Sequence, residues 1–455
     1  MSNLEALMWH VEKDPMLSST FGSLTIFDRA PDPNRLRRRV EYLVSTFARM
    51  RRKVRPALGR LAPPAWVEDP EFDLDHHLRW IGLPSPARPE NLCELAVHLI
   101  ADPLDRTRPL WEFVVVEGLA DGRAAMIQKL HHTITDGAGG IRLSERLVDL
   151  ERDAPDPEPH QTETPPHRED GFWKVTQATL GHGLRRSLGV TRRSVEGALH
   201  ALADPAGLPR TVVETARTTV SVLRQFAVTD HARSPLWRER TLRRWFGTIQ
   251  VPFDDAKRAA ANLGGTLNDF FVTGAAEAAW RYHCQHGAVV SELRMAMPVS
   301  TRKDRSAGGN AFAPARVLVP TGPMPPAERF MEVSRRLAAT KRERAISVAA
   351  GIAGLINLLP TSVLVRLVRD QASTVDFATS NVRAAPFHVY IAGARVEANF
   401  PLGPLACTAW NLTMMSYAGS LDMGLHVDSG AVSDPPLLRR FLEASYEDLI
   451  AAGTP

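Results

Sequence analysis

The sequence predicts a mixed α/β protein built from two parts of similar size, or from one elaborate domain. The chain has 455 residues, which is long for one compact core. A proline-rich, charge-rich stretch with almost no apolar residues, 151–170, interrupts it. The folded parts mix strand-like and helix-like patterns. We therefore expect an N-terminal part over 1–150, a linker and basic helical connector over 151–240, and a C-terminal part over 241–455.

The clearest strand pattern lies near the end of the N-terminal part. Residues 112–119 and 123–132 read as two strands around a turn at Ala120-Asp121-Gly122. The second strand, which we place from Ala124 to Leu130, delivers His131 and His132 at its end. Side chains held at a strand end before a tight turn have a well-defined position, so this strand end is a candidate site.

Helix patterns follow in both parts. Residues 136–140, Asp-Gly-Ala-Gly-Gly, predict a glycine-rich turn that leads into an amphipathic helix over 141–150. In the C-terminal part, residues 264–283 predict a helix that begins near Asn268.

Composition and cysteine usage exclude several classes of protein. Apolar residues make up 44% and charged residues 23%, as in ordinary globular proteins, which excludes a disordered or fibrous chain. The cysteines Cys93, Cys284 and Cys407 are far apart, so neither a disulfide framework nor a cysteine metal site is indicated. The first residues carry acids and no export signal. We expect a cytoplasmic protein.

One uncharged stretch, 345–365, is about as long as a bilayer requires. Asn357 and Pro360 lie inside it, which favours two short helices broken at Leu359-Pro360 over a membrane span. These helices would either line a lipid cavity or belong to the ordinary core.

The adjacent histidines are the best candidates for chemistry. Neighbouring strand residues point to opposite faces, so one of His131 and His132 would be catalytic and the other structural. A zinc site needs further convergent ligands that do not accompany them, so we expect no metal. No G-x-S-x-G motif indicates a serine nucleophile. A histidine acting as general base on a substrate hydroxyl or amine remains. A second pair, His76-His77, lacks the aspartate and glycines, and we expect it to be structural or on the surface.

The run His-His-x-x-x-Asp-Gly, His131 to Gly137, is the signature of the CoA-dependent acyltransferase superfamily. Its flanks are equally characteristic, and together they resemble the bacterial wax ester synthase/acyl-CoA:diacylglycerol acyltransferase family over nearly the whole chain. The flanking motifs are P-P-A-W-V-E-D-P-E-F-D-L-D-H-H-L from Pro63, D-P-L-D-R-T-R-P-L-W-E from Asp102, G-G-T-L-N-D-F from Gly264, M-P-V-S-T-R from Met297, S-N-V from Ser380 and M-S-Y-A-G-S-L-D-M-G-L from Met415.

The resemblance implies two chloramphenicol-acetyltransferase-like halves with an active-site channel at their interface. It implies that His132 is the general base and that Asp136 holds the motif by pairing with an arginine. Arg302 is our candidate for that arginine, because a buried carboxylate needs a partner. His131 and Gly137 complete the motif.

The same resemblance assigns further residues to the substrates. Pro109-Leu110-Trp111 and Asn268-Asp269 match active-site motifs of the family, and Asn268 together with Ser380 or Asn381 could donate hydrogen bonds to the reacting group. Two structural alternatives stay open: Asn268 as a helix cap and Trp111 as a packed core aromatic. The Pro-Gly-Pro that usually follows Ser-Asn-Val is absent, since the chain reads S-N-V-R-A-A-P over 380–386.

The implied activity is transfer of an acyl group from acyl-CoA to diacylglycerol, a long-chain alcohol or both. Acyl-CoA is a substrate, and no cofactor is expected. Two other readings stay open: a catalytically silent relative that binds lipid, and a condensation-type enzyme that uses carrier-bound substrates. No carrier domain is visible in the sequence, and no pattern indicates a nucleic-acid partner. The oligomeric state is not indicated.

A basic segment suggests where such an enzyme works. Residues 171–247 carry 13 Lys and Arg against 5 Asp and Glu. Within them, 209–227 predicts a helix with one apolar face, flanked by Arg210, Arg217 and Arg224. Such a helix can lie on an anionic membrane, so we expect peripheral association with the inner membrane face or with lipid droplets. The alternative is that its apolar face packs against the protein.

Overall fold

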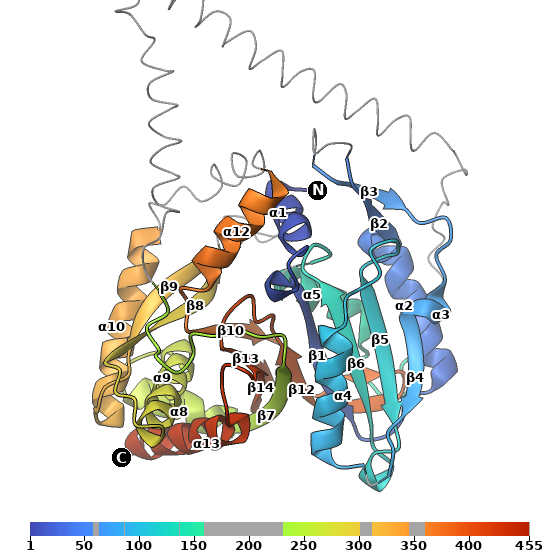
Figure 1. The fold of residues 1–455 in the computed structure, drawn as a ribbon. Helices are drawn as coiled ribbons and strands as arrows, with labels where there is room; N and C mark the ends of the chain where they lie inside the picture. The colour runs from blue at the N-terminus through green and yellow to red at the C-terminus, as the bar shows by residue number, and fades with distance from the viewer. Residues whose placement is uncertain are drawn as a thin grey trace, which may run out of the picture.

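The computed structural model describes residues 1–57, 63–85, 87–135, 137–158, 231–300, 312–344 and 360–454. These residues form two halves that lie side by side, each with its own six-stranded sheet (Figure 1). The mixed α/β class and the two-part architecture expected from the sequence are confirmed. Among the described residues, no helix combines the length and the apolar character that crossing a bilayer demands.

The N-terminal sheet has the strand order β11-β12-β1-β6-β5-β4. Its pairs are antiparallel except β4 with β5, which is parallel. The strands are β1 Thr20–Phe27, β4 Leu78–Gly82, β5 Trp111–Glu117, β6 Ala124–His131, β11 Tyr390–Ile391 and β12 Ala394–Leu402. A separate hairpin joins β2 Arg52–Arg55 to β3 Ala65–Glu68.

Helices cover both faces of this sheet because its strands are apolar on both sides. Ala125 and Ile127 of β6 pack with α4, whereas Met126 and Leu130 pack with α2 and α5. The helices are α1 Asn3–Val11, α2 Pro33–Thr46, α3 Leu74–His77, α4 Pro89–Ala101 and α5 Gly137–Leu147, with short 3₁₀ turns η1 Pro15–Leu17, η2 Ala48–Met50 and η4 Ala120–Gly122.

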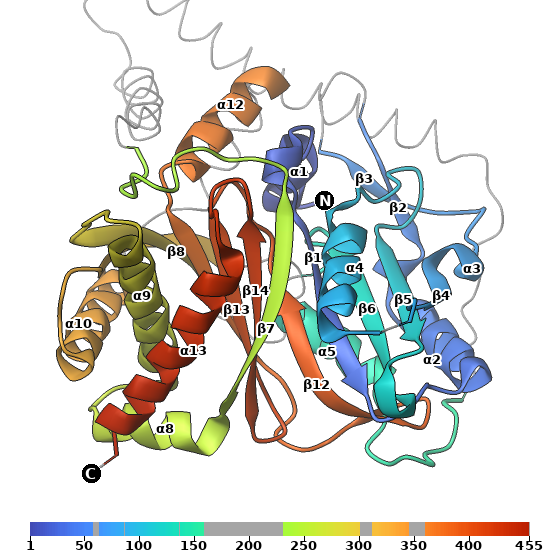
Figure 2. The same cartoon turned by 60° about the horizontal axis from the view of Figure 1, so that its bottom comes forward.

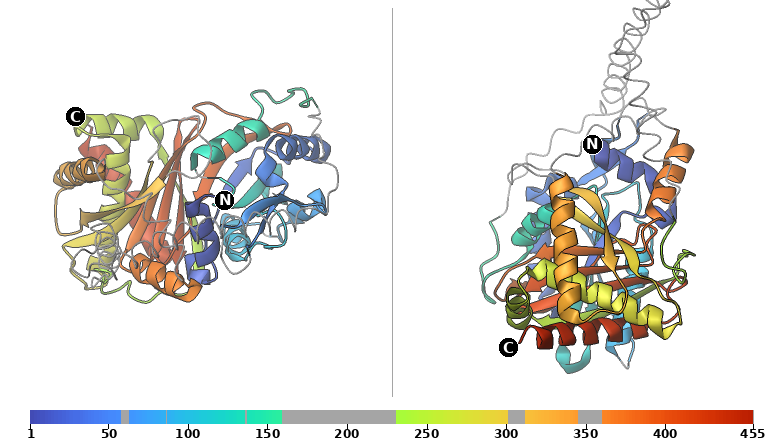
Figure 3. Two further views of the ribbon diagram at one scale, coloured as in Figure 1. Left: turned by 90° about the horizontal axis from the view of Figure 1, so that it is seen from above. Right: turned by 90° about the vertical axis from the view of Figure 1, so that its left-hand side faces the viewer.

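The C-terminal sheet has the order β7-β14-β13-β10-β8-β9. Helices α9, α10 and α13 pack on one face, the side away from the N-terminal half (Figure 3). The strands are β7 Arg244–Pro252, β8 Glu292–Ser300, β9 Phe312–Pro320, β10 Phe377–Arg383, β13 Trp410–Tyr417 and β14 Ser420–Asp428. The helices are α8 Phe253–Asn262, α9 Leu267–Gln285, α10 Pro326–Arg344, α12 Thr361–Ala372 and α13 Pro435–Ala452.

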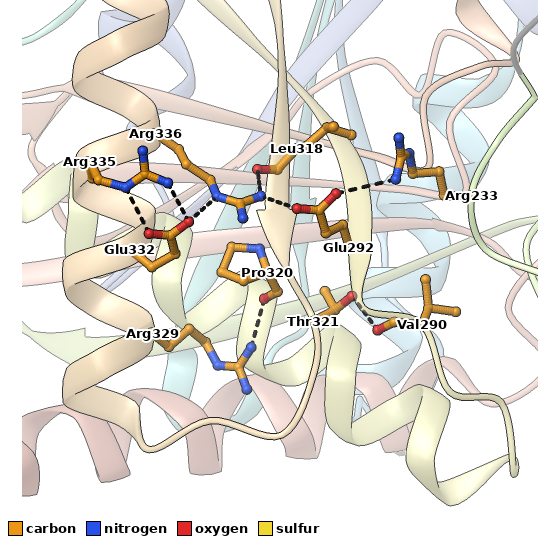
Figure 4. Close-up of polar contacts among 10 residues, drawn as sticks. All are labelled: Arg233, Val290, Glu292, Leu318, Pro320, Thr321, Arg329, Glu332, Arg335 and Arg336. Carbon is orange, nitrogen blue, oxygen red and sulfur yellow. Dashed lines mark hydrogen bonds and ion pairs between the residues drawn. The ribbon is translucent and has the colours of Figure 1, made fainter.

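Ion pairs attach α10 to the edge of the C-terminal sheet (Figure 4). Arg336 donates to a carboxylate oxygen of Glu292 on β8 at 2.7 Å and to the carbonyl of Leu318 on β9 at 2.8 Å. Arg329 is fully buried and donates to Glu277 of α9 at 2.6 Å and to the carbonyl of Pro320 at 2.7 Å. These contacts fix α10 against β8, β9 and α9.

The C-terminal part of the chain contributes strands to the N-terminal sheet. β12 follows β10 in sequence but pairs with β1 in the N-terminal sheet, after which the chain returns to the C-terminal sheet as β13 (Figure 2). Gly424 of β14 lies directly against this crossing strand, since a Cβ atom there would meet the carbonyl oxygen of Pro401 at 1.9 Å. The chain approach at this point therefore requires glycine.

Most expected elements near the histidines are confirmed, with one correction. The two strands around Ala120–Gly122 are present as β5 and β6, and the helix over 264–283 is α9. The helix after the motif was expected over 141–150, but α5 spans 137–147, so Gly137 to Gly140 form its first turn and not a separate loop. The expected turn was wrong because glycine, although a poor helix former, is tolerated in a first turn.

Two sequence features fall partly or wholly outside the described residues. Of the apolar stretch 345–365, only Pro360 to Val365 are described, and they begin α12, whose Leu364 packs against α1. The linker is described over 151–158, where Arg35 and Arg38 of α2 contact its backbone and Asp156. The basic helix expected over 209–227 lies outside the described residues.

Candidate active site

β6 ends at the histidine pair, on the side of the N-terminal sheet where β1 begins. His131 is the last residue of β6 and pairs with Thr20 of β1. Its backbone N–H donates to the carbonyl of Leu110 at 3.1 Å, and that of His132 donates to the carbonyl of Ser19 at 3.0 Å. The strand and its two neighbours therefore hold the backbone of both histidines.

His131 is buried, and both of its ring nitrogens are engaged. Its Nδ1 accepts from the backbone N–H of Thr133 at 3.1 Å and lies 2.7 Å from the Thr133 hydroxyl. Because a backbone N–H can only donate, Nδ1 carries a lone pair, and the ring proton is on Nε2. Nε2 then donates to Oε2 of Glu12 at 2.7 Å. The ring of His131 is thus fixed with its Nε2–H directed at Glu12.

Glu12 is the partner that fixes this tautomer. Its other oxygen, Oε1, accepts from the Ser18 hydroxyl at 3.0 Å and from the Ser19 backbone N–H at 3.1 Å. Burial raises the pKa of Glu12, but the hydrogen bonds from His131, Ser19 and Ser18 outweigh it, so this pKa lies below its ordinary value. Glu12 is therefore a carboxylate at neutral pH.

His132 has a different environment. It is half-buried, and its ring lies 4.4 Å from the ring of Phe21, with the planes 31° apart. The two histidines therefore have different surroundings: His131 is enclosed by Glu12 and Thr133, whereas His132 keeps part of its surface exposed. That one of them is catalytic and the other structural stays a prediction.

The turn after the histidines is held by an arginine. Nη1 of Arg49 donates to the carbonyls of Thr133 at 2.7 Å and Ile134 at 3.2 Å, and to the buried carboxylate of Glu5 at 2.8 Å. Asp136 and its expected partner Arg302 both lie outside the described residues, so their pairing stays a prediction. Gly137 follows as the first residue of α5.

The Pro109-Leu110-Trp111 motif leads into β5, the strand that pairs with β6. Leu110 supplies the carbonyl that accepts from His131, and Trp111 is fully buried. The Trp111 indole donates to the carbonyl of Met50 at 2.8 Å and stacks on His77 with 4.6 Å between ring centroids. Trp111 is thus a packed core aromatic, one residue after the Leu110 carbonyl that binds His131.

His77 is buried in that core, so the expectation of a structural residue holds and that of a surface position does not. Its Nδ1 lies 2.7 Å from the carbonyl of Trp111. Burial lowers the pKa of His77 to about 4. The ring is therefore neutral at physiological pH.

Asn268 and Asp269 lie in the first turn of α9, in the C-terminal half. The helix cap is Thr266, and not Asn268 as one alternative had it. Asp269 is buried and accepts from the backbone N–H and hydroxyl of Thr266 at 2.8 and 2.7 Å, which completes a capping box. Nδ2 of Asn268 is buried and has no hydrogen-bond partner among the described residues.

Ser380 and Asn381 lie on β10 and point to opposite faces. Phe377 and Thr379 are buried on the face covered by the C-terminal helices, so Ser380 faces the other side, with its neighbour in the register, Thr413 of β13. Asn381 is exposed. The two cannot serve the same oxygen atom, and Ser380 is the one on the side of the N-terminal half.

The structure brings part of the expected set together. His131, Leu110 and Trp111 are in contact, and α5, which continues the histidine motif, lies against β10, the strand of Ser380. Sequence reasoning missed Glu12, Phe21 and Arg49. No local pattern marks these residues, because each reaches the histidine turn from a distant part of the chain.

Comparisons with known proteins agree along the chain. Residues 1–271 match the model of the wax ester synthase/diacylglycerol acyltransferase catalytic domain, and residues 308–450 match that of the WS/DGAT C-terminal domain. A putative diacylglycerol O-acyltransferase of Mycobacterium tuberculosis H37Rv is 32% identical over 99% of this chain and 92% of its own length. A probable diacylglycerol O-acyltransferase of strain CDC 1551 is 28% identical over 96% of this chain and 92% of its own.

Solved structures show the same fold. The wax ester synthase/diacylglycerol acyltransferase from Marinobacter aquaeolei VT8 superposes with a TM-score of 0.67 at 21% identity, covering 99% of both chains. The first condensation domain of the CDA synthetase superposes with a TM-score of 0.56 at 16% identity, covering 100% of this chain and 96% of that domain. Both likenesses extend over both halves.

Proposed function

The chain belongs to the wax ester synthase/diacylglycerol acyltransferase family, and from that premise we propose that it is an acyl-CoA-dependent O-acyltransferase with His132 as general base. The proposed acceptor is diacylglycerol, a long-chain alcohol or both. One observation carries the choice of base: both ring nitrogens of His131 are engaged, by Glu12 and Thr133, whereas His132 is half-buried beside Phe21.

The proposed reaction needs only the two substrates. His132 takes the proton of the acceptor hydroxyl while its oxygen attacks the thioester carbonyl carbon of acyl-CoA. The tetrahedral oxyanion then collapses, the C–S bond breaks, and the CoA thiolate leaves and receives the proton from His132. The products are an ester and free CoA, and no cofactor is consumed.

Two side chains are proposed as donors to the oxyanion. The assignment of Ser380 is supported by its position on the sheet face directed toward the N-terminal half. Asn268 is supported by its buried Nδ2, which lacks a partner among the described residues. Asp269 and Trp111 serve this site by holding α9 and the histidine turn in place.

We also propose that the protein works at a lipid surface, in peripheral association with the inner membrane face or with lipid droplets. The support is chemical: the proposed acceptors and products are insoluble in water, and residues 171–247 are strongly basic.

Acyl transfer from labelled palmitoyl-CoA to a panel of acceptors tests the proposal, with wild type and His132→Ala side by side. The panel contains diacylglycerol, hexadecanol, a short alcohol and an amine. Ester formation by wild type that is lost in His132→Ala supports the proposal. Binding of lipid without turnover would favour a silent relative. Transfer only from an acyl group on a carrier protein to the amine would favour a condensation-type enzyme, whose fold this chain shares.

A further inference from the structure

The connection that returns the chain from β12 to β13, residues 403–409, has an unusual backbone. We call it the return loop. Ala406 and Cys407 have φ angles of 45° and 66°, in the left-handed region that residues with a Cβ atom disfavour. Such a conformation persists only where the surroundings impose it.

Side chains of the C-terminal half hold the return loop in this left-handed conformation by donating hydrogen bonds to its carbonyl groups. His426 and Asn411 are buried and lie opposite each other on β14 and β13. The bonds are His426 Nδ1 to the carbonyl of Gly403 at 2.9 Å, Asn411 Nδ2 to that of Pro404 at 2.7 Å, the Thr408 hydroxyl to that of Leu405 at 2.6 Å, and Arg240 Nε to that of Cys407 at 2.8 Å.

At the left-handed turn the return loop contacts the N-terminal half. The backbone N–H of Cys407 donates to the carbonyl of Met16 at 3.1 Å. The Cys407 side chain is buried in a small apolar cluster between α1 and α12, made by Val11, Met16, Leu17 and Leu364.

Met16 lies in residues 12–21, the segment whose Glu12 and Ser19 form hydrogen bonds with His131 and His132. Four residues before it, Glu12 binds His131, and three residues after it, Ser19 accepts the backbone N–H of His132. Phe21, whose ring contacts that of His132, follows at the start of β1. A shift of the return loop would therefore be passed to the histidines through residues 12–21.

We propose that the return loop is a positioning element for the reaction: it sets segment 12–21, and with it His132, relative to the C-terminal sheet that carries Ser380. Ala406, Thr408 and Arg240 are then positioning residues, because they act on His132 through Met16 and Ser19 without touching substrate. This inference rests on the proposed function of His132, and it adds residues of the C-terminal half that no motif marks.

Ala406 offers a clean test because its side chain is exposed, so a substitution alters the backbone preference and little packing. Ala406→Gly permits the left-handed conformation, whereas Ala406→Val strongly disfavours it. Asp121→Val is the matched control. Asp121 is exposed, has a φ of 60°, and lies in the β5–β6 turn, at the opposite end of β6 from His131.

The full-length variants are compared for kcat and KM with palmitoyl-CoA and the best acceptor. Ala406→Val should lower kcat about tenfold or more at similar KM, since a misplacement of about 1 Å can cost about 100-fold. Ala406→Gly should keep kcat within about twofold, and Asp121→Val should lower only the melting temperature. Wild-type kcat in Ala406→Val, or an equal loss in Asp121→Val, overturns the proposal.

Amide hydrogen exchange supplies a readout that does not depend on turnover. Ala406→Val should speed exchange in peptides covering 12–21, and Asp121→Val should not. If wild type transfers no acyl group, the proposed function fails, while the exchange result still decides whether the return loop holds this segment. Should Ala406→Val fail to fold, Thr408→Val, which keeps the side-chain shape and removes the hydroxyl bond to Leu405, takes its place with the same expected loss of kcat.

Discussion

Glu12 and His131 are 119 residues apart in sequence, and a 2.7 Å hydrogen bond joins their side chains. The bond fixes the proton of His131 on Nε2 and ties the segment after α1 to the turn that carries the histidine motif. A carboxylate that orients a histidine in this way fixes its tautomer and its ring position. The position of the histidine turn therefore depends on Glu12 and its neighbours near the end of α1.

Glu12→Gln should destabilise the protein at neutral pH, because it replaces a charge-assisted hydrogen bond with a neutral one. The pKa of folded Glu12 lies below its ordinary value of 4.5, so the carboxylate contributes stability that is fully present above that value. This contribution is lost as the pH falls through the folded pKa. Melting temperatures of wild type and Glu12→Gln should therefore differ at pH 7 and converge toward pH 3.

The exposed Glu117 provides the control, since Glu117→Gln should melt like wild type at both pH values. A difference between wild type and Glu12→Gln that stays constant from pH 7 to pH 3 would contradict the role given to the Glu12 carboxylate.

His132→Ala should lower turnover by about 10²–10⁴-fold, the usual effect of a lost general base, in a protein that stays folded. His131→Ala should act mainly through packing, with a lower melting temperature, because His131 is buried between Glu12 and Thr133. Steady-state kinetics at saturating substrate and thermal melts separate the two effects. If His132→Ala retains more than about a tenth of wild-type turnover, another group is the base.

Arg329→Met should reduce the free energy of unfolding by about 3 kcal/mol, since Glu277 keeps only Arg281 as a cation and the carbonyls of Pro320 and Gly322 lose their donor. Arg335 is the contrast on the same helix (Figure 4): its side chain is 67% exposed, so solvent screens its pair with Glu332 and the loss should be small. Urea unfolding of Arg329→Met and Arg335→Met measures both. Equal losses would mean that burial does not set the strength of these pairs.

Asp136→Ala should impair folding more than catalysis. Loss of one partner of a buried ion pair lowers the free energy of unfolding by about 3–5 kcal/mol. Arg302→Ala should then behave alike. A double-mutant cycle on thermal stability measures the coupling between them. Additive effects of the two substitutions would eliminate Arg302 as the partner.

Changing Arg210, Arg217 and Arg224 together to Gln should weaken salt-sensitive binding to vesicles that contain anionic lipid, since each basic residue near such a surface contributes about 1 kcal/mol. Flotation of wild type and the triple variant at low salt measures the effect. Equal flotation would mean that 209–227 is not the anchor.

Local patterns predicted the parts of the site that are close in sequence. Two apolar runs around the turn at Ala120–Gly122 predicted the β5–β6 pair, and strand geometry predicted that His131 and His132 point to opposite faces. The start of α5 was misplaced because glycines suggest a turn from sequence alone, whereas here they begin the helix. Local sequence patterns predict that a helix or strand is present, but they predict its first and last residues poorly.

The long-range contacts could not be predicted. The pairing of β12 with β1 joins residues 369 to 380 positions apart, and no spacing rule selects that partner over the strands next to it in sequence. Glu12 and Phe21 reach the histidines from the start of the chain, and a lone glutamate or phenylalanine there has no distinctive context. Tertiary packing alone decides which residues meet at the turn.

The place of β12 in the N-terminal sheet also sets an order of events during translation. β1 leaves the ribosome long before the strand that covers its free side, which is complete only when residue 402 has been synthesised. Until then β1 is an unpaired sheet edge of eight residues, open to pairing with another nascent chain. The N-terminal sheet is therefore completed only after β7 to β10 of the C-terminal half have been made, and during that interval the exposed edge of β1 is a place where nascent chains can associate.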